Sequence, residues 1–173
     1  MHIIRRTLDA VYDGAGALAA ICLVAILLVI SLQVVARWAG IPFPGSSEYA
    51  GYLMAAASFL AFAHTLNRGA HIRVNLLLSA LGRYRFWGEL WCLVIASVAS
   101  SYLAWFAVKT VYWSRKLHDV SQGQDATPLW IVQTPVAIGA IILAICFIDN
   151  LVTLIATRRD NIRADLTEQS RAE

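Results

Sequence analysis

The sequence predicts an all-α integral membrane protein with four transmembrane helices. Of its 173 residues, 59% are hydrophobic and only 14% are charged, whereas a soluble domain carries roughly half and roughly a quarter. The charged residues also leave four long uncharged stretches, at 14–36, 49–67, 90–108 and 126–148. At ~1.5 Å rise per helical residue, each stretch reaches about 28 to 35 Å and can cross a hydrocarbon core of ~30 Å.

The first two predicted helices cover about 14–36 and 48–67 and are joined by a tight turn. The first is expected to be retained rather than cleaved as a secretory signal, because its apolar run exceeds the ~7 to 15 residues of a signal core. Ser46 or Ser47 can cap the second helix, with Glu48 in its first turn. The turn between them is marked by Gly40, Pro42, Pro44 and Gly45.

A short helix in the membrane interface is expected between the second and third spans, after a helix stop at Gly69. An irregular apolar loop is the alternative. The helical interpretation rests on apolar residues at helical spacing, namely Val74, Leu77, Leu78 and Leu81.

The third and fourth spans are expected at about 87–109 and 128–150. Thr127 and Pro128 suit the cap and first residue of the fourth helix. Pro135 should bend that helix, because proline lacks a backbone donor. Residues 1–158 are thus expected to form a single four-helix membrane domain, and residues 159–173 a cytoplasmic tail.

The positions of Lys and Arg predict the orientation, because these residues flank spans mainly on the cytoplasmic side. Ten of the 14 lie before the first span, between the second and third, or after the fourth. Both termini and the middle loop are therefore expected in the cytoplasm. Trp and Tyr residues at the expected span ends agree with this assignment. The other four basic residues lie on the outer side: Arg37, Lys109, Arg115 and Lys116.

The spans lack the charged groups near the midplane that pumps and transporters use to bind ions and substrates. Their charged side chains lie at the ends of the spans instead. A pore or pump in this chain alone is therefore not expected. Only His64 of the four histidines lies inside a span, and we expect it to be hydrogen-bonded or to face the membrane interface rather than to be a haem or zinc ligand. The sequence predicts no catalytic, cofactor or metal site. The pieces outside the spans are too short for a soluble domain, which argues against nucleic-acid binding.

Small residues four positions apart predict close helix packing, because they let backbones approach in lipid. Packing among the chain's own four helices is the favoured interpretation. The pairs are Ala57 with Ala61, Ser97 with Ser101, and Ala140 with Ala144.

The run from Asn67 to Asn75 follows the second span, which begins near Glu48. Together with the Pro-rich start of the last helix, this pattern resembles the small membrane subunit, of DctQ type, of tripartite ATP-independent periplasmic (TRAP) transporters. The resemblance covers about residues 5–155. The sequence departs from the family pattern at Asn75, where an aspartate is usual. The matching positions are Arg37, Glu48, Arg68, Gly69, His71, Ile72 and Val74.

The resemblance implies a non-catalytic small permease subunit in the bacterial inner membrane, without a cofactor. It implies a larger membrane subunit that holds the substrate and sodium sites, and a periplasmic substrate-binding protein that delivers an organic anion. The small subunit would then brace the scaffold of the large one and help to dock the binding protein, within a sodium-coupled symport of organic acids.

Five residues are candidates for contact with partners or membrane lipids: Arg37, Glu48, Arg68, His71 and Arg73. The last three are expected to bind lipid phosphates or carboxylates of the large subunit, although positive-inside anchoring explains the arginines equally well. Arg37 and Glu48 flank the outer turn and can pair with each other or with a partner. Glu48 near a helix start is also favoured by the helix dipole.

Topology alone places the docking face for the soluble partner at residues 38–47 and 112–130. Two other classes of protein stay open at this point. A membrane-anchor subunit of a respiratory complex would need facing histidines for haem or a quinone pocket, and an absorption spectrum would reveal it. A small homo-oligomeric channel or exporter would transport by itself in a flux assay.

Overall fold

The computed structural model describes residues 2–41, 43–67, 85–123 and 126–157, and the helices of this part are α1 (His2–Trp38), α2 (Ser46–Asn67), α4 (Arg85–Leu117) and α5 (Leu129–Thr157). Each is long and apolar enough to cross a membrane. The described residues form no sheet, since their one β-pairing is an isolated bridge between Val120 and Pro128. The prediction of an all-helical protein with four membrane-length helices is confirmed for these residues. The expected stop at Gly69 and the expected interfacial helix lie outside them.

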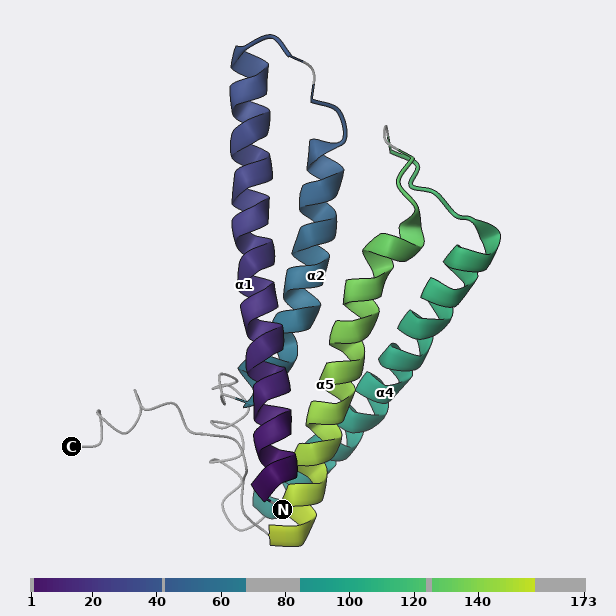
Figure 1. Cartoon of the computed structure of the whole chain (residues 1–173). Coiled ribbons are helices and arrows are strands. Elements are labelled where there is room, and N and C mark those ends of the chain that lie inside the picture. Colours follow the sequence, from purple (N-terminus) through teal and green to yellow (C-terminus); the bar gives the residue numbers. More distant parts are fainter. Residues whose placement is uncertain (1, 42, 68–84, 124–125, 158–173) are drawn as a thin grey trace, which may run out of the picture.

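The helices form two antiparallel hairpins, α1 with α2 and α4 with α5, as Figure 1 shows. The hairpins meet through α2 and α5, so the order across the molecule is α1, α2, α5, α4. They diverge toward the end where α1 stops and α2 starts, at the top of Figure 1, which we call the upper end. The opposite end, where α1 begins, is the lower end.

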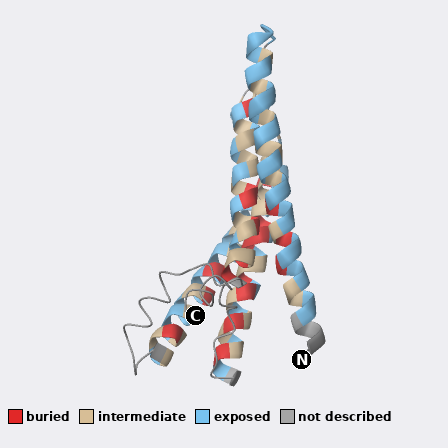
Figure 2. Ribbon diagram, turned by 90° about the vertical axis from the view of Figure 1, so that its left-hand side faces the viewer, coloured by how far each residue is buried: buried red, intermediate tan, exposed pale blue. Residues whose placement is uncertain are grey.

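The core lies mainly in the lower part of the molecule, where Figure 2 shows most of the buried residues. Tyr12 of α1, Ala63 and Leu66 of α2, and Cys146 of α5 form a buried cluster. The Cys146 thiol donates to the Ala63 carbonyl at 3.7 Å, and this contact joins α5 to α2. Three helices therefore meet at the lower end.

Glycines allow the closest approaches between helices. A Cβ added at Gly139 of α5 would lie 2.7 Å from the backbone carbon of Phe59 on α2. A Cβ at Gly16 of α1 would lie 2.8 Å from the His64 ring. The Nδ1 atom of His64 is 3.3 Å from a carboxylate oxygen of Asp13, which agrees with the hydrogen-bonded role expected for this histidine.

Two of the three small-residue pairs predicted from the sequence take part in this packing, whereas Ser101 of the third pair is exposed. Ala57, Ala140 and Ala144 are buried, and so is Ser97 of α4. The Ser97 hydroxyl donates to the Leu93 carbonyl of its own helix at 2.6 Å, so its polar group is satisfied without a partner helix. Small side chains thus line the contacts between the chain's own helices, as expected for packing in lipid.

We expect Gly139→Ala to destabilise the protein by about 1 to 3 kcal/mol, because the added methyl group would press on the backbone of α2. Gly51→Ala is the matched control, since a Cβ at Gly51 of α2 meets nothing within 4 Å. Alanine suits a helix better than glycine, so the control should be neutral or slightly stabilising. Thermal unfolding in detergent measures both, and equal transition temperatures would contradict this packing.

Candidate functional site

The upper end combines two loops with the ends of all four described helices. In the first loop, Gly40 and Gly45 adopt φ angles of +69° and +76°, a conformation that glycine adopts without strain. α2 then begins at Ser46, whose hydroxyl donates to the Phe43 carbonyl at 3.3 Å. The turn predicted from its glycines is present in this loop.

The second loop, between α4 and α5, is held by the first two turns of α2. The hydroxyls of Tyr52 and Ser121 are 2.6 Å apart, and those of Tyr49 and Thr127 are 3.3 Å apart. These bonds join residues that are far apart in the sequence. They couple the two hairpins at the upper end, where the helix axes themselves diverge.

Glu48 contributes to the same contact. A Cβ added at Gly123 of the second loop would coincide with the Glu48 carboxylate, so a side chain at this position would displace that carboxylate from the loop. Glu48 is half-buried and lies in the first turn of α2, where the helix dipole favours an acidic group. The structure thus places this predicted candidate against the second loop.

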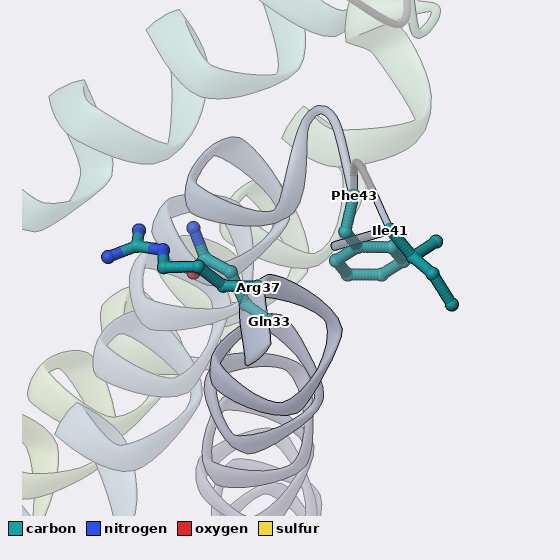
Figure 3. A pocket seen from close by; sticks show the side chains of 4 residues that line it. All are labelled: Gln33, Arg37, Ile41 and Phe43. Carbon is teal, nitrogen blue, oxygen red and sulfur yellow. The ribbon is translucent and has the colours of Figure 1, made fainter. Parts of the chain in front are cut away.

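Arg37 lies in the last turn of α1 and is exposed. It lines an open pocket of about 210 Å³ together with Gln33, Ile41 and Phe43. Figure 3 shows the Arg37 side chain extended away from Ile41 and Phe43. Within the described residues no ion pair joins Arg37 to Glu48, so the structure leaves the Arg37 guanidinium available to an external anion.

Three further cations at the upper end pack on aromatic rings. The Lys109 ammonium lies 5.7 Å from the centre of the Phe106 ring, and the Lys116 ammonium lies 5.1 Å from the Trp113 ring. The Arg115 guanidinium of α4 lies 5.7 Å from the Trp130 ring of α5. The three cations are exposed and make no ion pair with a carboxylate of the described part of the chain. Such ring contacts orient a cation and leave its charge accessible.

These cation–ring contacts were not predicted from the sequence. The spacing of Lys109 and Lys116 from aromatic residues three positions earlier was a usable signal, because such residues are neighbours on a helix. The Arg115 contact and the Glu48 contact each join two different elements, so no local sequence pattern predicts them. The other three candidates, Arg68, His71 and Arg73, lie outside the described residues.

No group of three or more His, Cys, Asp or Glu side chains gathers among the described residues in an arrangement that would hold a metal ion. The features of the site are instead an exposed basic upper end and long uncovered apolar helix faces. Together with the four membrane-length helices, these define a multi-pass membrane protein whose surface chemistry suits contact with other molecules.

The family described as "Tripartite ATP-independent periplasmic transporters, DctQ component" matches residues 26–157. The chain therefore belongs to the DctQ family of TRAP transporters, which confirms the resemblance derived from the sequence. Comparisons with curated proteins and with solved structures gave no match. The family is a component of a transporter rather than an enzyme, and it implies a large membrane subunit and a substrate-binding protein as partners.

We expect Tyr52→Phe to loosen the second loop, because it removes the 2.6 Å bond to Ser121. A hydrogen bond contributes about 1 kcal/mol, so amide exchange of residues 118–123 should accelerate about fivefold. Tyr49→Phe is the matched control and should have a smaller effect, because its bond to Thr127 is longer and exposed. Hydrogen exchange with mass spectrometry measures both. Unchanged exchange in Tyr52→Phe would contradict the proposed anchoring of the loop.

Proposed function

We propose that this chain is the non-catalytic small subunit of a TRAP transporter, which braces the scaffold of the large membrane subunit. It also helps to dock the periplasmic substrate-binding protein, during sodium-coupled uptake of an organic anion across the bacterial inner membrane. The observation that carries this proposal is the family match over residues 26–157. Both termini face the cytoplasm in this proposal, which follows from the distribution of basic residues.

The bracing role is supported by how little of the helices the chain itself covers. α1 packs mainly on α2, and α4 mainly on α5, so the two outer helices each keep a wide apolar face uncovered. The uncharged central parts of the helices suit contact with lipid or other helices and offer no charge for carrying an ion. Substrate and sodium therefore pass through the large subunit in this proposal.

The docking role is supported by the charge of the upper end. Arg37, Lys109, Arg115 and Lys116 are exposed there and make no ion pair with a carboxylate of the described residues. Exposed charges of one sign steer a soluble partner of the opposite sign and raise its association rate. An acidic face on the substrate-binding protein would complement this surface.

The remaining candidates, Arg68, His71 and Arg73, lie on the side that we place in the cytoplasm. We propose that they bind lipid phosphates or carboxylates of the large subunit, because arginine suits bidentate pairing with such groups. This proposal rests on their positions after the second span.

Reconstitution in liposomes tests the proposed function. The large subunit with this chain and the binding protein should take up an organic anion when a sodium gradient is imposed. This chain alone should transport neither ion, and omission of this chain should abolish or strongly reduce uptake. Anion or sodium flux through this chain alone would overturn the proposal and favour a homo-oligomeric channel.

We expect the double variant Arg115→Gln, Lys116→Gln to weaken docking of the binding protein several-fold and to reduce its salt dependence, since two steering charges are lost. Arg6→Gln, an exposed arginine of α1 at the lower end, is the matched control and should leave docking unchanged. The measurement is the concentration of binding protein that gives half-maximal uptake, at two ionic strengths. Equal values for both variants would exclude these cations from docking.

We expect Arg73→Glu to reduce recovery of the large subunit in a pull-down, because it replaces a cation with a charge that repels carboxylates and phosphates. Arg171→Glu, in the expected tail, makes the same charge change and should not alter recovery. Unchanged complex yield and uptake in Arg73→Glu would remove this residue from the interface.

A further inference from the structure

α4 presents a continuous row of large side chains away from the rest of the chain. Its members lie three, four or seven positions apart, so they share one face of the helix. We call this row the α4 stripe, and all of its residues are exposed: Trp87, Trp91, Val98, Tyr102, Trp105 and Tyr112. Lys109 and Lys116 continue the same face at the upper end.

The opposite face of α4 carries small polar residues and is buried. Ser97, Ser100 and Ser114 lie there, on the helix that packs against α5. α4 therefore buries three of its four serines and exposes its tryptophans and tyrosines. Lipid alone does not require this arrangement, because aliphatic side chains satisfy hydrocarbon equally well.

The aromatic residues at the ends of the stripe suit the membrane interface, where Trp and Tyr are enriched. Tyr102 does not lie near the interface. It is one residue from the midpoint of α4 (Arg85–Leu117) and three residues from the midpoint of the uncharged stretch 90–108. At ~1.5 Å per residue, these offsets are at most about 5 Å, against a half-thickness of ~15 Å for the hydrocarbon core. The phenol group therefore lies deep in the membrane.

Trp105 lies three residues nearer the upper end than Tyr102, about 6 to 9 Å from the same two midpoints, so Tyr102 and Trp105 both bring polar groups into the hydrocarbon core. Their side chains are 66% and 71% exposed. The Tyr102 ring packs against the Phe106 ring, with centroids 4.6 Å apart and planes tilted by 46°. Neither the Tyr102 hydroxyl nor the Trp105 indole N–H has a hydrogen-bond partner among the described residues. An unpaired polar group in hydrocarbon has a high free-energy cost. We therefore expect these two donors to bond with acceptors on another protein.

We infer that the α4 stripe is the surface on which a transmembrane helix of the large membrane subunit packs, with hydrogen-bond acceptors at the depth of Tyr102 and Trp105. This inference rests on the proposed function and specifies which face of the chain is used. Buried aromatic side chains anchor protein interfaces, and tyrosine and tryptophan dominate such contacts.

The lysines of the stripe argue against a second copy of this chain as the occupant. Two copies facing each other through α4, related by a two-fold axis along the membrane normal, would bring both Lys109 side chains together at one depth. The two Lys116 side chains would meet in the same way, and like charges at close range repel. A different helix, with acidic or carbonyl groups near its outer end, complements Lys109 and Lys116 instead.

α5 provides an internal comparison. It also exposes a regular row, but this row is wholly aliphatic and includes Ile138, Ile141, Ile145, Ile148 and Val152. It carries no polar group at mid-membrane depth, so contact with acyl chains leaves nothing unsatisfied. We therefore assign the α5 row to lipid and the α4 stripe to protein.

Site-specific photocrosslinking in the assembled transporter, in native lipid, tests the assignment. A benzophenone amino acid at position 102 should yield an adduct of this chain with the large subunit. The same probe at position 141, two residues from the midpoint of α5, is the control and should yield mainly lipid adducts. Adducts at position 102 with lipid only, or with a second copy of this chain, would overturn the inference.

Conservative variants supply the second measurement. Tyr102→Phe and Trp105→Phe keep an aromatic ring and remove one donor each, so this chain should still fold. Each should lower the recovery of the large subunit roughly threefold, the usual effect of one hydrogen bond between helices in a membrane. Trp38→Phe, at the upper end of α1 and outside the stripe, should leave the recovery of the large subunit unchanged, because residues 38–47 are assigned to the binding protein and not to the large subunit. Unchanged recovery in both stripe variants would contradict the assignment.

The two proposals fail differently. If the large subunit co-purifies with this chain while position 102 labels lipid, the α4 assignment is wrong and the proposed function stands. If the large subunit does not associate with this chain at any probe position, the proposed function itself fails.

Discussion

The contact between α2 and α5 is the constraint on which the rest of the structure depends. It is the main contact between the two hairpins in the described part of the chain, because α1 and α4 lie on opposite outer sides and α1 meets α5 only near the lower end. Gly139 makes the approach possible, since any larger residue would meet the backbone of α2 at Phe59. In lipid no hydrophobic force drives helices together, so close contact between small residues and backbone has to supply the association.

This central contact also determines what the outer helices can do. With α2 and α5 occupied by each other, α1 and α4 keep broad faces free for other molecules. The divergence of the hairpins separates the two upper loops, and the Tyr52 and Glu48 contacts bridge that gap from α2 to the second loop. One chain thus offers both a lateral surface within the membrane and a basic end outside the hydrocarbon.

The arrangement suits a subunit that supports transport without performing it. A transport path needs polar groups deep in the membrane that are arranged around a passage, whereas α4 carries its deep aromatic polar groups, Tyr102 and Trp105, on an outward-facing stripe. The family match places the chain within a tripartite transport system, and another component of such a system can pack on this outward surface.

The sequence by itself determined the four membrane-length helices, the turn at Gly40 and Gly45, and the family, because hydrocarbon thickness and backbone strain act on local runs of residues. It also indicated Glu48 as a candidate, since a helix start is a local signal. Contacts between elements were not predictable from the sequence, because they depend on which helix faces meet. Examples are the approach of Gly123 to Glu48, the Arg115 contact with Trp130, and the burial of Ser97 instead of Tyr102. Only the tertiary structure decided these contacts, because a helix that is apolar on all faces has no amphipathic pattern that indicates which face packs on a neighbour.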